Sequence, residues 1–323
     1  MDAEAILASR RSLPPPPPAH TRKTEAEGGC GVIGMASSAE IEGRHLLPAL
    51  QQMRNRGNGK GGGVAAAGLD PDFFGVRPDV LAEDYLLAIA FLDPAARPEV
   101  ERSFLEPNFA VDRDAELACA PGARSAFGLE VEPPAVHCYF ARVRPDVLRD
   151  FARRYGFSEE SAAADEIVYQ TSYRLDRALY AAAGEKRAFV LSRGKDLLVV
   201  KMVGYGDDVV RTYGLEGLRA HVWIGHHRYP TKGRVWHPGG AHPFVGLHEA
   251  LVHNGDFANY TSLCSWLGQR NVHPLFLTDT EVAALAFDLL HRVYGYPLEY
   301  VIEALAPTTE RDFALLPPTK RRV

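Results

Sequence analysis

Cysteine is scarce in this sequence. The 323 residues contain four cysteines, at positions 30, 119, 138 and 264, and their separations match neither a zinc ribbon nor a small disulfide framework. No apolar run approaches the ~18 residues that span a bilayer, and the N-terminus lacks the apolar core of a secretory signal. We therefore expect a cytoplasmic protein that keeps its thiols reduced and does not bind membranes.

An excess of positive charge is also missing. The formal net charge is −5, so nucleic acid is not an expected partner. The chain has no glycine loop of the GxxxxGK type to cradle phosphates and no cysteine cluster for iron–sulfur, so we expect no cofactor. Hydrophobic residues make up 46% of the chain, which is typical of a protein that folds around a core.

Residues 1–29 differ in composition from the rest of the chain. They contain five consecutive prolines at 14–18 and a polar stretch that ends in Gly28 and Gly29. Such a segment cannot form a packed core. Two alternatives stay open: a disordered tail, or a leader removed before Cys30.

Hydrophobic periodicity predicts a chain of mixed strands and helices. Predicted strands cover 30–36, 61–67, 85–92, 135–142, 188–191, 197–202 and 221–225, and predicted helices cover 44–53, 98–105, 145–155 and a last helix from Thr280. Thr278 and Glu281 have the spacing of a capping box. Residues 84–192 resemble an insertion whose element order fits a ferredoxin-like subdomain, and residues 193–196 resemble a hairpin turn.

Five short segments far apart in the sequence carry chemically active side chains. They are CGVIG at 30–34, RNRG at 54–57, HHRYPT at 226–231, AHPF at 241–244 with VHNG at 252–255, and TDTE at 278–281. In content and order they resemble the glutaminase domains of class-II glutamine amidotransferases, which are N-terminal-nucleophile hydrolases. The resemblance covers residues 30–68 and 188–292. Around Arg228 and Asn254 the sequence is most similar to the glutamate-synthase-like branch.

The resemblance implies that Cys30 is the nucleophile and forms a thioester with glutamine. A cysteine at the chain terminus carries its own base, because a free α-amino group has a pKa of about 7.7 to 8. The Gly29–Cys30 bond must then be cut. Asn254 and Gly255 resemble the donors that stabilise the oxyanion. The alternatives are a buried inert cysteine and an Asn-Gly hairpin turn between two strands.

The resemblance also implies recognition of both ends of a free amino acid. Arg228 resembles the arginine that pairs with the α-carboxylate, where a planar fork suits better than lysine. Thr231 would assist there, Asp279 would bind the α-ammonium, and Arg56 would lie near the nucleophile. The alternatives are helix capping for Asp279 and a surface position for Arg56.

Histidine is concentrated in one region, with seven of the twelve between residues 221 and 253. This density raises a rival hypothesis, a metal-dependent hydrolase. However, His226 and His227 are adjacent and would point to opposite faces of a strand. The resemblance instead gives His242 and His253 supporting roles in fixing the active-site loops, with no metal ligands.

The fold implied by the resemblance is the four-layer αββα sandwich, an α+β class, over residues 30–323 with the α+β insertion at about 84–192. The sequence departs from the family at Asn58, where relatives place an acidic residue, and at Lys232. It also stops at Val323, whereas relatives continue with further strands, which leaves two alternatives: the domain is truncated at this end, or those strands come from elsewhere.

The expected activity is hydrolysis of L-glutamine to glutamate and ammonia. Because the chain shows no synthase of its own, a partner subunit that accepts the ammonia is implied, one resembling the remainder of glutamate synthase. A second rival hypothesis is a non-catalytic glutamine-sensing or scaffold subunit in which Cys30 is never exposed.

Overall fold

The computed structural model describes residues 29–180, 185–229, 237–255, 257–319 and 321. The predicted leader, except Gly29, and the predicted site residue Thr231 lie outside these described residues. The described chain contains two four-stranded antiparallel sheets and a short two-stranded one, together with helices. The expected α+β class is therefore confirmed.

The first large sheet, sheet A, carries the segment that begins at Cys30. Its strands lie in the order β1-β8-β2-β7, with β1 (Gly31–Glu42), β2 (Gly62–Leu69), β7 (Leu197–Met202) and β8 (Arg219–His227). Each neighbouring pair is antiparallel. The pairing sets Gly31 opposite His227, so the start of β1 lies beside the residues that follow β8.

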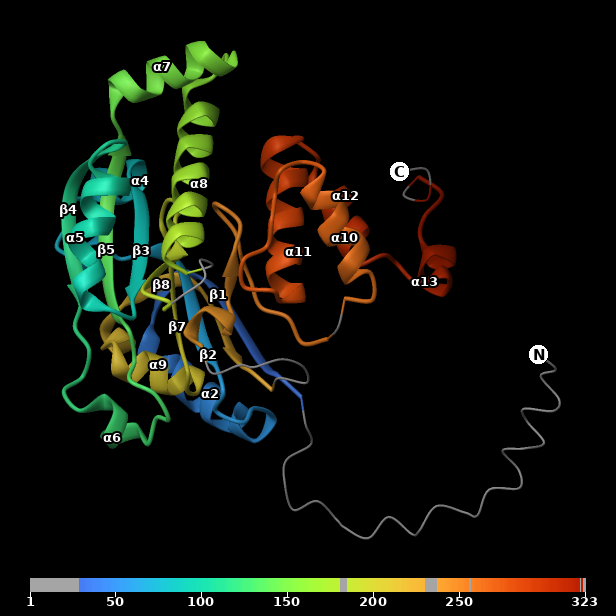
Figure 1. Ribbon diagram of the computed structural model, residues 1–323. Coiled ribbons are helices and arrows are strands. Elements are labelled where there is room, and N and C mark those ends of the chain that lie inside the picture. Colours follow the sequence, from blue (N-terminus) through green and yellow to red (C-terminus); the bar gives the residue numbers. More distant parts are fainter. Residues whose placement is uncertain (1–28, 181–184, 230–236, 256, 320, 322–323) are drawn as a thin grey trace, which may run out of the picture.

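One face of sheet A is covered by two helices, α2 (Leu46–Met53) and α9 (Gly206–Thr212) (Figure 1). The other face is approached by backbone, as expected for a strand rich in small residues. A side chain at Gly63 of β2 would collide with the carbonyl oxygen of His242. Glycine is therefore required at this position for the 237–243 segment to pack against the sheet.

The second large sheet, sheet B, is formed entirely within the predicted insertion. Its order is β4-β5-β3-β6, with β3 (Tyr85–Phe91), β4 (Phe109–Leu117), β5 (Ala135–Val143) and β6 (Ala188–Ser192). Helical segments connect β3 to β4 and β5 to β6, which gives the β-α-β-β-α-β order of a ferredoxin-like unit.

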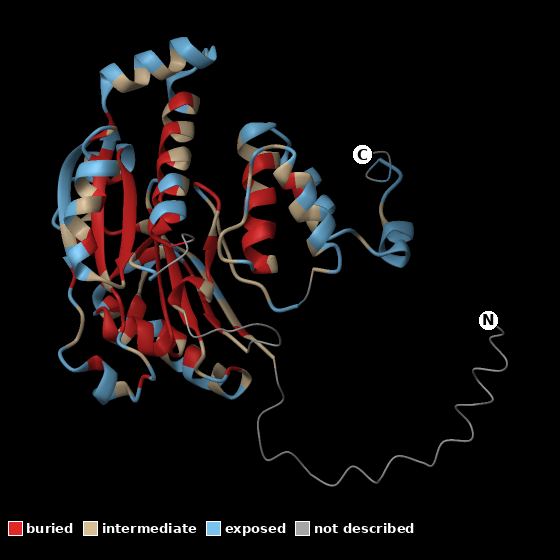
Figure 2. Cartoon of the chain, viewed as in Figure 1, coloured by how far each residue is buried: buried red, intermediate tan, exposed pale blue. Residues whose placement is uncertain are grey.

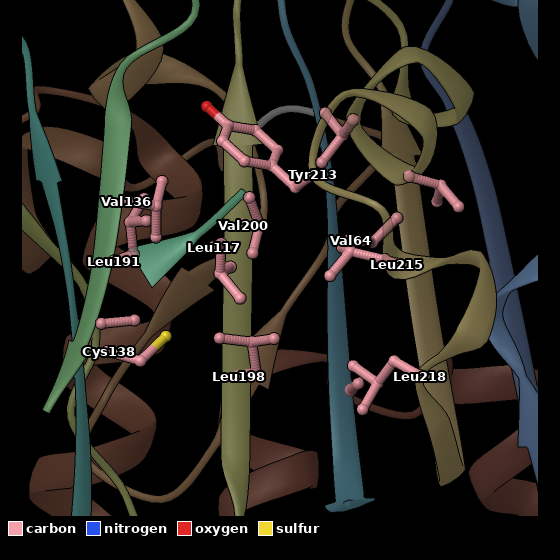
Figure 3. Packing of buried hydrophobic residues seen from close by; sticks show 14 of the residues in the cluster. Val64, Leu117, Val136, Cys138, Leu191, Leu198, Val200, Tyr213, Leu215 and Leu218 are labelled. Atoms are coloured by element: carbon pink, nitrogen blue, oxygen red, sulfur yellow. The ribbon is translucent and has the colours of Figure 1, made fainter. Parts of the chain in front are cut away.

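Helices α5 (Arg97–Val100) and α8 (Glu160–Leu179) pack on one face of sheet B, where they contribute to a single hydrophobic cluster with β3 and β5. The opposite face of sheet B shares a second cluster with sheet A, in which Val136, Cys138 and Leu191 approach Leu198 and Val200 (Figure 3). Helices α3 (Pro71–Phe74), α4 (Pro78–Glu83) and α6 (Ala123–Phe127) contribute to this second cluster, whereas α7 (Pro145–Tyr155) packs against the first.

The predicted hairpin turn at residues 193–196 is wrong. Strand β6 pairs with β3 in sheet B, whereas β7 pairs with β2 in sheet A, so this connection passes from one sheet to the other. Asp196, with a φ of 50°, fixes the crossing, because its carboxylate accepts a hydrogen bond of 2.7 Å from the Leu69 N–H.

The helix expected near Thr280 is α11 (Asp279–Asp288), but it is not the last one. It follows the hairpin β9 (Phe244–Val245) and β10 (Ala250–Leu251) and helix α10 (Tyr260–Gly268), and it precedes α12 (Leu298–Leu305) and α13 (Glu310–Leu315). Figure 2 shows α13 and α7 largely exposed and the inner side of α11 buried. Short 3-10 and π turns join these elements at Gly43–His45, Arg54–Arg56, Pro94–Ala96, Glu101–Leu105, Leu215–Gly217, Pro238–Gly240 and Leu289–Val293.

The capping box at the start of α11 forms only in part. Thr278 is the N-cap, and its hydroxyl accepts from the Glu281 N–H at 3.1 Å. The Glu281 carboxylate instead accepts from the N–H groups of Leu275 and Phe276, at 2.5 and 2.8 Å. Across the described residues, no helix is long and apolar enough to cross a membrane.

Besides Arg193, three buried ionisable side chains line a cavity of about 40 Å³ between α8, β7 and α11. They are Asp176, Lys201 and Glu281. Burial raises the pKa of Asp176 to about 7 and that of Glu281 to about 7, and it lowers the pKa of Lys201 to about 7. A cavity of this size has room for water that solvates the three groups.

The raised pKa of Asp176 predicts a pH-dependent stability. The folded protein keeps a proton on Asp176 that the unfolded chain loses near pH 4. The contribution of this carboxyl group to the free energy of unfolding is therefore lost as the pH rises towards 7. The side-chain oxygen of Asp176→Asn can still accept from the Val190 N–H. The free energy of unfolding of this variant, relative to that of the wild type, should therefore increase by up to about 1.4 kcal/mol for each pH unit between about pH 4 and pH 7. Urea unfolding at several pH values measures the difference.

The exposed Asp150→Asn on α7 is the matched control and should follow the wild type at every pH. Parallel stability curves for Asp176→Asn and the wild type would contradict the prediction.

Candidate active site

Cys30 directly precedes β1, and its thiol is half-buried against the residue that follows Arg228. The Tyr229 N–H donates to Cys30 Sγ at 3.4 Å. Burial raises the pKa of the Cys30 thiol, and the Tyr229 N–H and the Arg228 charge partly counteract this effect. The thiol is therefore neutral near pH 7, so a nucleophilic role requires a base.

Arg228 follows the last residue of β8, and its charge acts on the Cys30 thiol. Its backbone N–H donates to the Gly61 carbonyl at 2.8 Å, and its guanidinium donates to the Gly240 carbonyl. Burial lowers the pKa of Arg228, while the Cys30 and Asp279 charges act in the opposite direction. Within the described chain no carboxylate lies within 4.0 Å of this guanidinium, which leaves it suited to bind an anion.

Asp279 is the first residue of α11, and its carboxylate accepts hydrogen bonds from two backbone N–H groups. These belong to Thr280, at 2.8 Å, and Phe257, at 3.2 Å, while His253 Nδ1 lies 3.7 Å from the same carboxylate. The Asp279 charge raises the pKa of Cys30, so the two groups interact. The helix-capping alternative holds only in part, because Thr278 is the N-cap.

Arg56 lies beside the backbone that leads into Cys30. A Cβ atom at Gly29 would stand 2.8 Å from Arg56 Nη2, and the Arg56 charge acts to lower the pKa of Cys30. Its 3-10 turn is anchored by Arg54, which pairs with Asp207 at 2.9 Å. Arg56 is thus held beside Cys30 rather than at a remote surface.

Asn254 and Gly255 are both exposed, and the described residues make no hydrogen bond between either of them and Cys30. The prediction that they form a hairpin turn between two strands is wrong, because the next element after β10 is helix α10. Asn254 and Gly255 are therefore not part of a strand. The His253 ring lies close to Gly255, since its Nε2 would be 3.0 Å from a Cβ atom at that position.

His226 and His227 point to opposite faces of β8, as expected. His226 Nε2 lies 3.2 Å from the His253 carbonyl oxygen, and its ring stacks on His242 at 4.1 Å between centroids. His242 Nε2 in turn lies 3.1 Å from Thr280 Oγ1. The stacked pair therefore links β8 to the segments that carry Asn254 and Asp279.

His227 has a structural role on the other face. Its Nδ1 accepts from the Gly206 N–H at 2.9 Å, so its Nε2 must carry the proton it shares with the Leu50 carbonyl at 2.7 Å. Burial lowers its pKa. In the part of the chain that the structure describes, no three His, Cys, Asp or Glu side chains come together in a way that could hold a metal ion.

Three contributors escaped prediction from the sequence: the Tyr229 N–H, the Gly240 carbonyl and the Thr280 hydroxyl. Two are backbone groups, which leave no residue-type signal. Thr280 was visible only as part of a helix start, since nothing local indicates that it contacts His242.

The chain also aligns with named enzymes over part of its length. It is 41% identical over 103 residues to a glutamine–fructose-6-phosphate aminotransferase from Aeropyrum pernix, covering 31% of this chain and 16% of that protein. It is 31% identical over 151 residues to an amidophosphoribosyltransferase from Methanothermobacter thermautotrophicus, covering 43% of this chain and 28% of that protein. Each alignment thus spans less than a third of the enzyme that it matches.

A longer alignment joins the chain to an uncharacterized protein from Archaeoglobus fulgidus. The two are 33% identical over 283 residues, which cover 86% of this chain and 67% of the relative. No protein-family model matches the chain. The chain belongs to the family of this archaeal protein, and part of its sequence is homologous to class-II glutamine amidotransferases.

Proposed function

We propose that this chain is a glutaminase domain that hydrolyses L-glutamine through Cys30. The observation that carries the proposal is the grouping of the half-buried Cys30 thiol, bonded to the backbone next to Arg228, with the Arg228 guanidinium, which has no carboxylate partner among the described residues, and the Asp279 carboxylate, whose charge acts on the pKa of Cys30. The partial homology to glutamine amidotransferases supports the same activity.

Arg228 and Asp279 define the substrate class. A free amino acid carries an α-carboxylate and an α-ammonium, and the two side chains have the complementary charges. Binding of the α-carboxylate would supply the counter-ion that Arg228 lacks within the described chain. A simple amide would satisfy neither charge, which disfavours general amidases and acylases.

The first chemical step is attack of the Cys30 sulfur on the side-chain carbonyl carbon of glutamine. The thiol proton passes to the free α-amino group of Cys30, which requires prior cleavage of the Gly29–Cys30 bond. Collapse of the tetrahedral intermediate breaks the C–N bond, and the departing ammonia takes that proton. Water then adds to the thioester, which releases glutamate and restores the thiol.

Asn254 and Gly255 are proposed to stabilise the oxyanion, with the amide side chain and a backbone N–H as donors. Their exposed position beside His253 leaves these groups accessible to a ligand. Replacement of Asn254 by alanine should lower kcat by about 10²- to 10³-fold with a smaller effect on KM. Steady-state release of glutamate measures both constants.

Asn259→Ala is the matched control. Asn259 is an exposed asparagine near Asn254 and precedes α10, but its side chain makes no capping hydrogen bond to that helix. The control variant should retain the wild-type kcat. An equal loss of kcat in Asn254→Ala and Asn259→Ala would contradict the proposal that Asn254 stabilises the oxyanion.

We also infer the αββα sandwich of N-terminal-nucleophile hydrolases as the family fold. Sheet A supports this inference, since α2 and α9 cover one face, and the Pro238–Gly240 turn and Phe244 at the start of β9 contact Lys201 on the other. The proposed domain covers residues 30–323 with residues 84–192 as an insertion, and residues 1–29 are the proposed leader. A cytoplasmic location stays a prediction.

Ammonia released here would be delivered to a partner synthase subunit, and a glutamate-synthase-like partner is our proposal. Purified chain incubated with L-glutamine should release equal amounts of glutamate and ammonia. Binding of glutamine without hydrolysis would instead favour the sensing subunit, and activity that a chelator abolishes would favour the metal-dependent hydrolase.

A further inference from the structure

Lys201 is a buried lysine in the middle of an apolar strand. It lies on β7, whose other residues are all hydrophobic, and only 3% of it is exposed. Its ammonium donates to the carbonyl oxygens of Gly239, at 3.2 Å, and Pro243, at 3.1 Å. The ammonium also lies 4.0 Å from the centre of the Phe244 ring, a cation–π contact.

The segment whose carbonyls accept from Lys201 also packs against the proposed substrate site. Between the two carbonyls, Gly240 accepts from the Arg228 guanidinium, and His242 contacts the Thr280 hydroxyl next to Asp279. Lys201 therefore holds both ends of a segment that contacts Arg228 directly and reaches Asp279 through Thr280. It touches neither binder itself.

Burial of this charge is expensive, and an apolar side chain would suit the strand better on packing grounds. None of the described carboxylates lies within 4.0 Å of the ammonium, although Glu281 and Asp176 act on it across the small cavity. Backbone carbonyls and aromatic faces are thus its direct partners. A lysine whose ammonium is buried without a close carboxylate among the described residues points to a role beyond stabilisation of the core.

We propose that Lys201 is a positioning residue that fixes the Gly239–Pro243 segment and thereby orients Arg228 towards the substrate α-carboxylate. This inference rests on the proposed glutaminase function. Without the ammonium, the two carbonyls lose their donor, the segment shifts, and Gly240 no longer holds the guanidinium. A displacement of about 1 Å in such a group can cost roughly 10²-fold in rate.

The test compares two substrates in the full-length purified protein. L-Glutaminamide carries a neutral amide where L-glutamine carries the α-carboxylate, so the ratio of their kcat/KM values reports how well Arg228 is placed. The wild type should prefer glutamine. In Lys201→Met this ratio should fall about tenfold or more, through a higher KM for glutamine, while hydrolysis of glutaminamide changes little.

Lys195→Met is the control, because it removes an exposed lysine just before the same strand and should leave the ratio unchanged. If Lys201→Met does not fold, Lys201→Gln is measured in its place; its N–H donor lies on a shorter side chain that reaches the two carbonyls less well, so the ratio should fall by a smaller factor. A loss of rate that is equal for both substrates would overturn the positioning role alone. A wild type inactive on glutamine would overturn the proposed function, and this inference with it.

Discussion

Replacing Cys30 with alanine is expected to abolish the release of ammonia from glutamine, with kcat at least about 10³-fold below the wild type. Alanine cannot form the thioester, and no other described thiol approaches Arg228 and Asp279. The loss should appear in kcat, because the groups proposed to bind glutamine are unchanged. An assay of glutamate and ammonia at saturating glutamine measures it.

Two further measurements separate chemistry from folding in this variant. Cys30→Ala should still be stabilised by glutamine in thermal unfolding, because binding to the folded state alone raises stability. Cys264→Ala is the matched control, a half-buried thiol on α10 that should keep full activity. Activity retained in Cys30→Ala would contradict the assignment.

Replacing Arg228 with methionine should lower kcat/KM for glutamine by roughly 30- to 5,000-fold. The loss of one partner from a buried charge pair costs about 2–5 kcal/mol, and each 1.36 kcal/mol is tenfold. The melting temperature of the free protein should change little, since the guanidinium has no carboxylate partner to lose in the described chain and its burial is itself unfavourable.

Glutamate should raise the melting temperature of the wild type and fail to do so in Arg228→Met. Arg153→Met, on the exposed helix α7, serves as the control and should behave as the wild type in both measurements. Unchanged kcat/KM in Arg228→Met would show that another group binds the α-carboxylate.

Local sequence patterns predicted most strands and several helices, but they missed β4, the β9–β10 hairpin and helix α8. The run Tyr85–Phe91 became β3, and Pro145–Tyr155 became α7, because hydrophobic periodicity and a first-turn proline act within one element. Local signals of this kind do not specify which strands pair with each other in a sheet. The turn at residues 193–196 was therefore mistaken for a hairpin, although β6 and β7 belong to different sheets.

The candidate site depended on resemblance more than on local pattern. The pairing of β1 with β8 brings Cys30 next to Arg228 across nearly 200 residues of sequence, and no periodicity encodes that register. Lys201 could have been noticed as a charge within an apolar strand. Its contacts with Gly239 and Pro243 could not, because they involve backbone carbonyls of a distant segment.

The most direct measurement is intact-mass and peptide mass spectrometry of the purified protein with and without 6-diazo-5-oxo-L-norleucine, a glutamine analogue that alkylates nucleophiles. Our account predicts a chain that begins at Cys30 and gains a single adduct, on Cys30. An adduct on Cys119, Cys138 or Cys264, or a chain that keeps residues 1–29 and does not react, would contradict it.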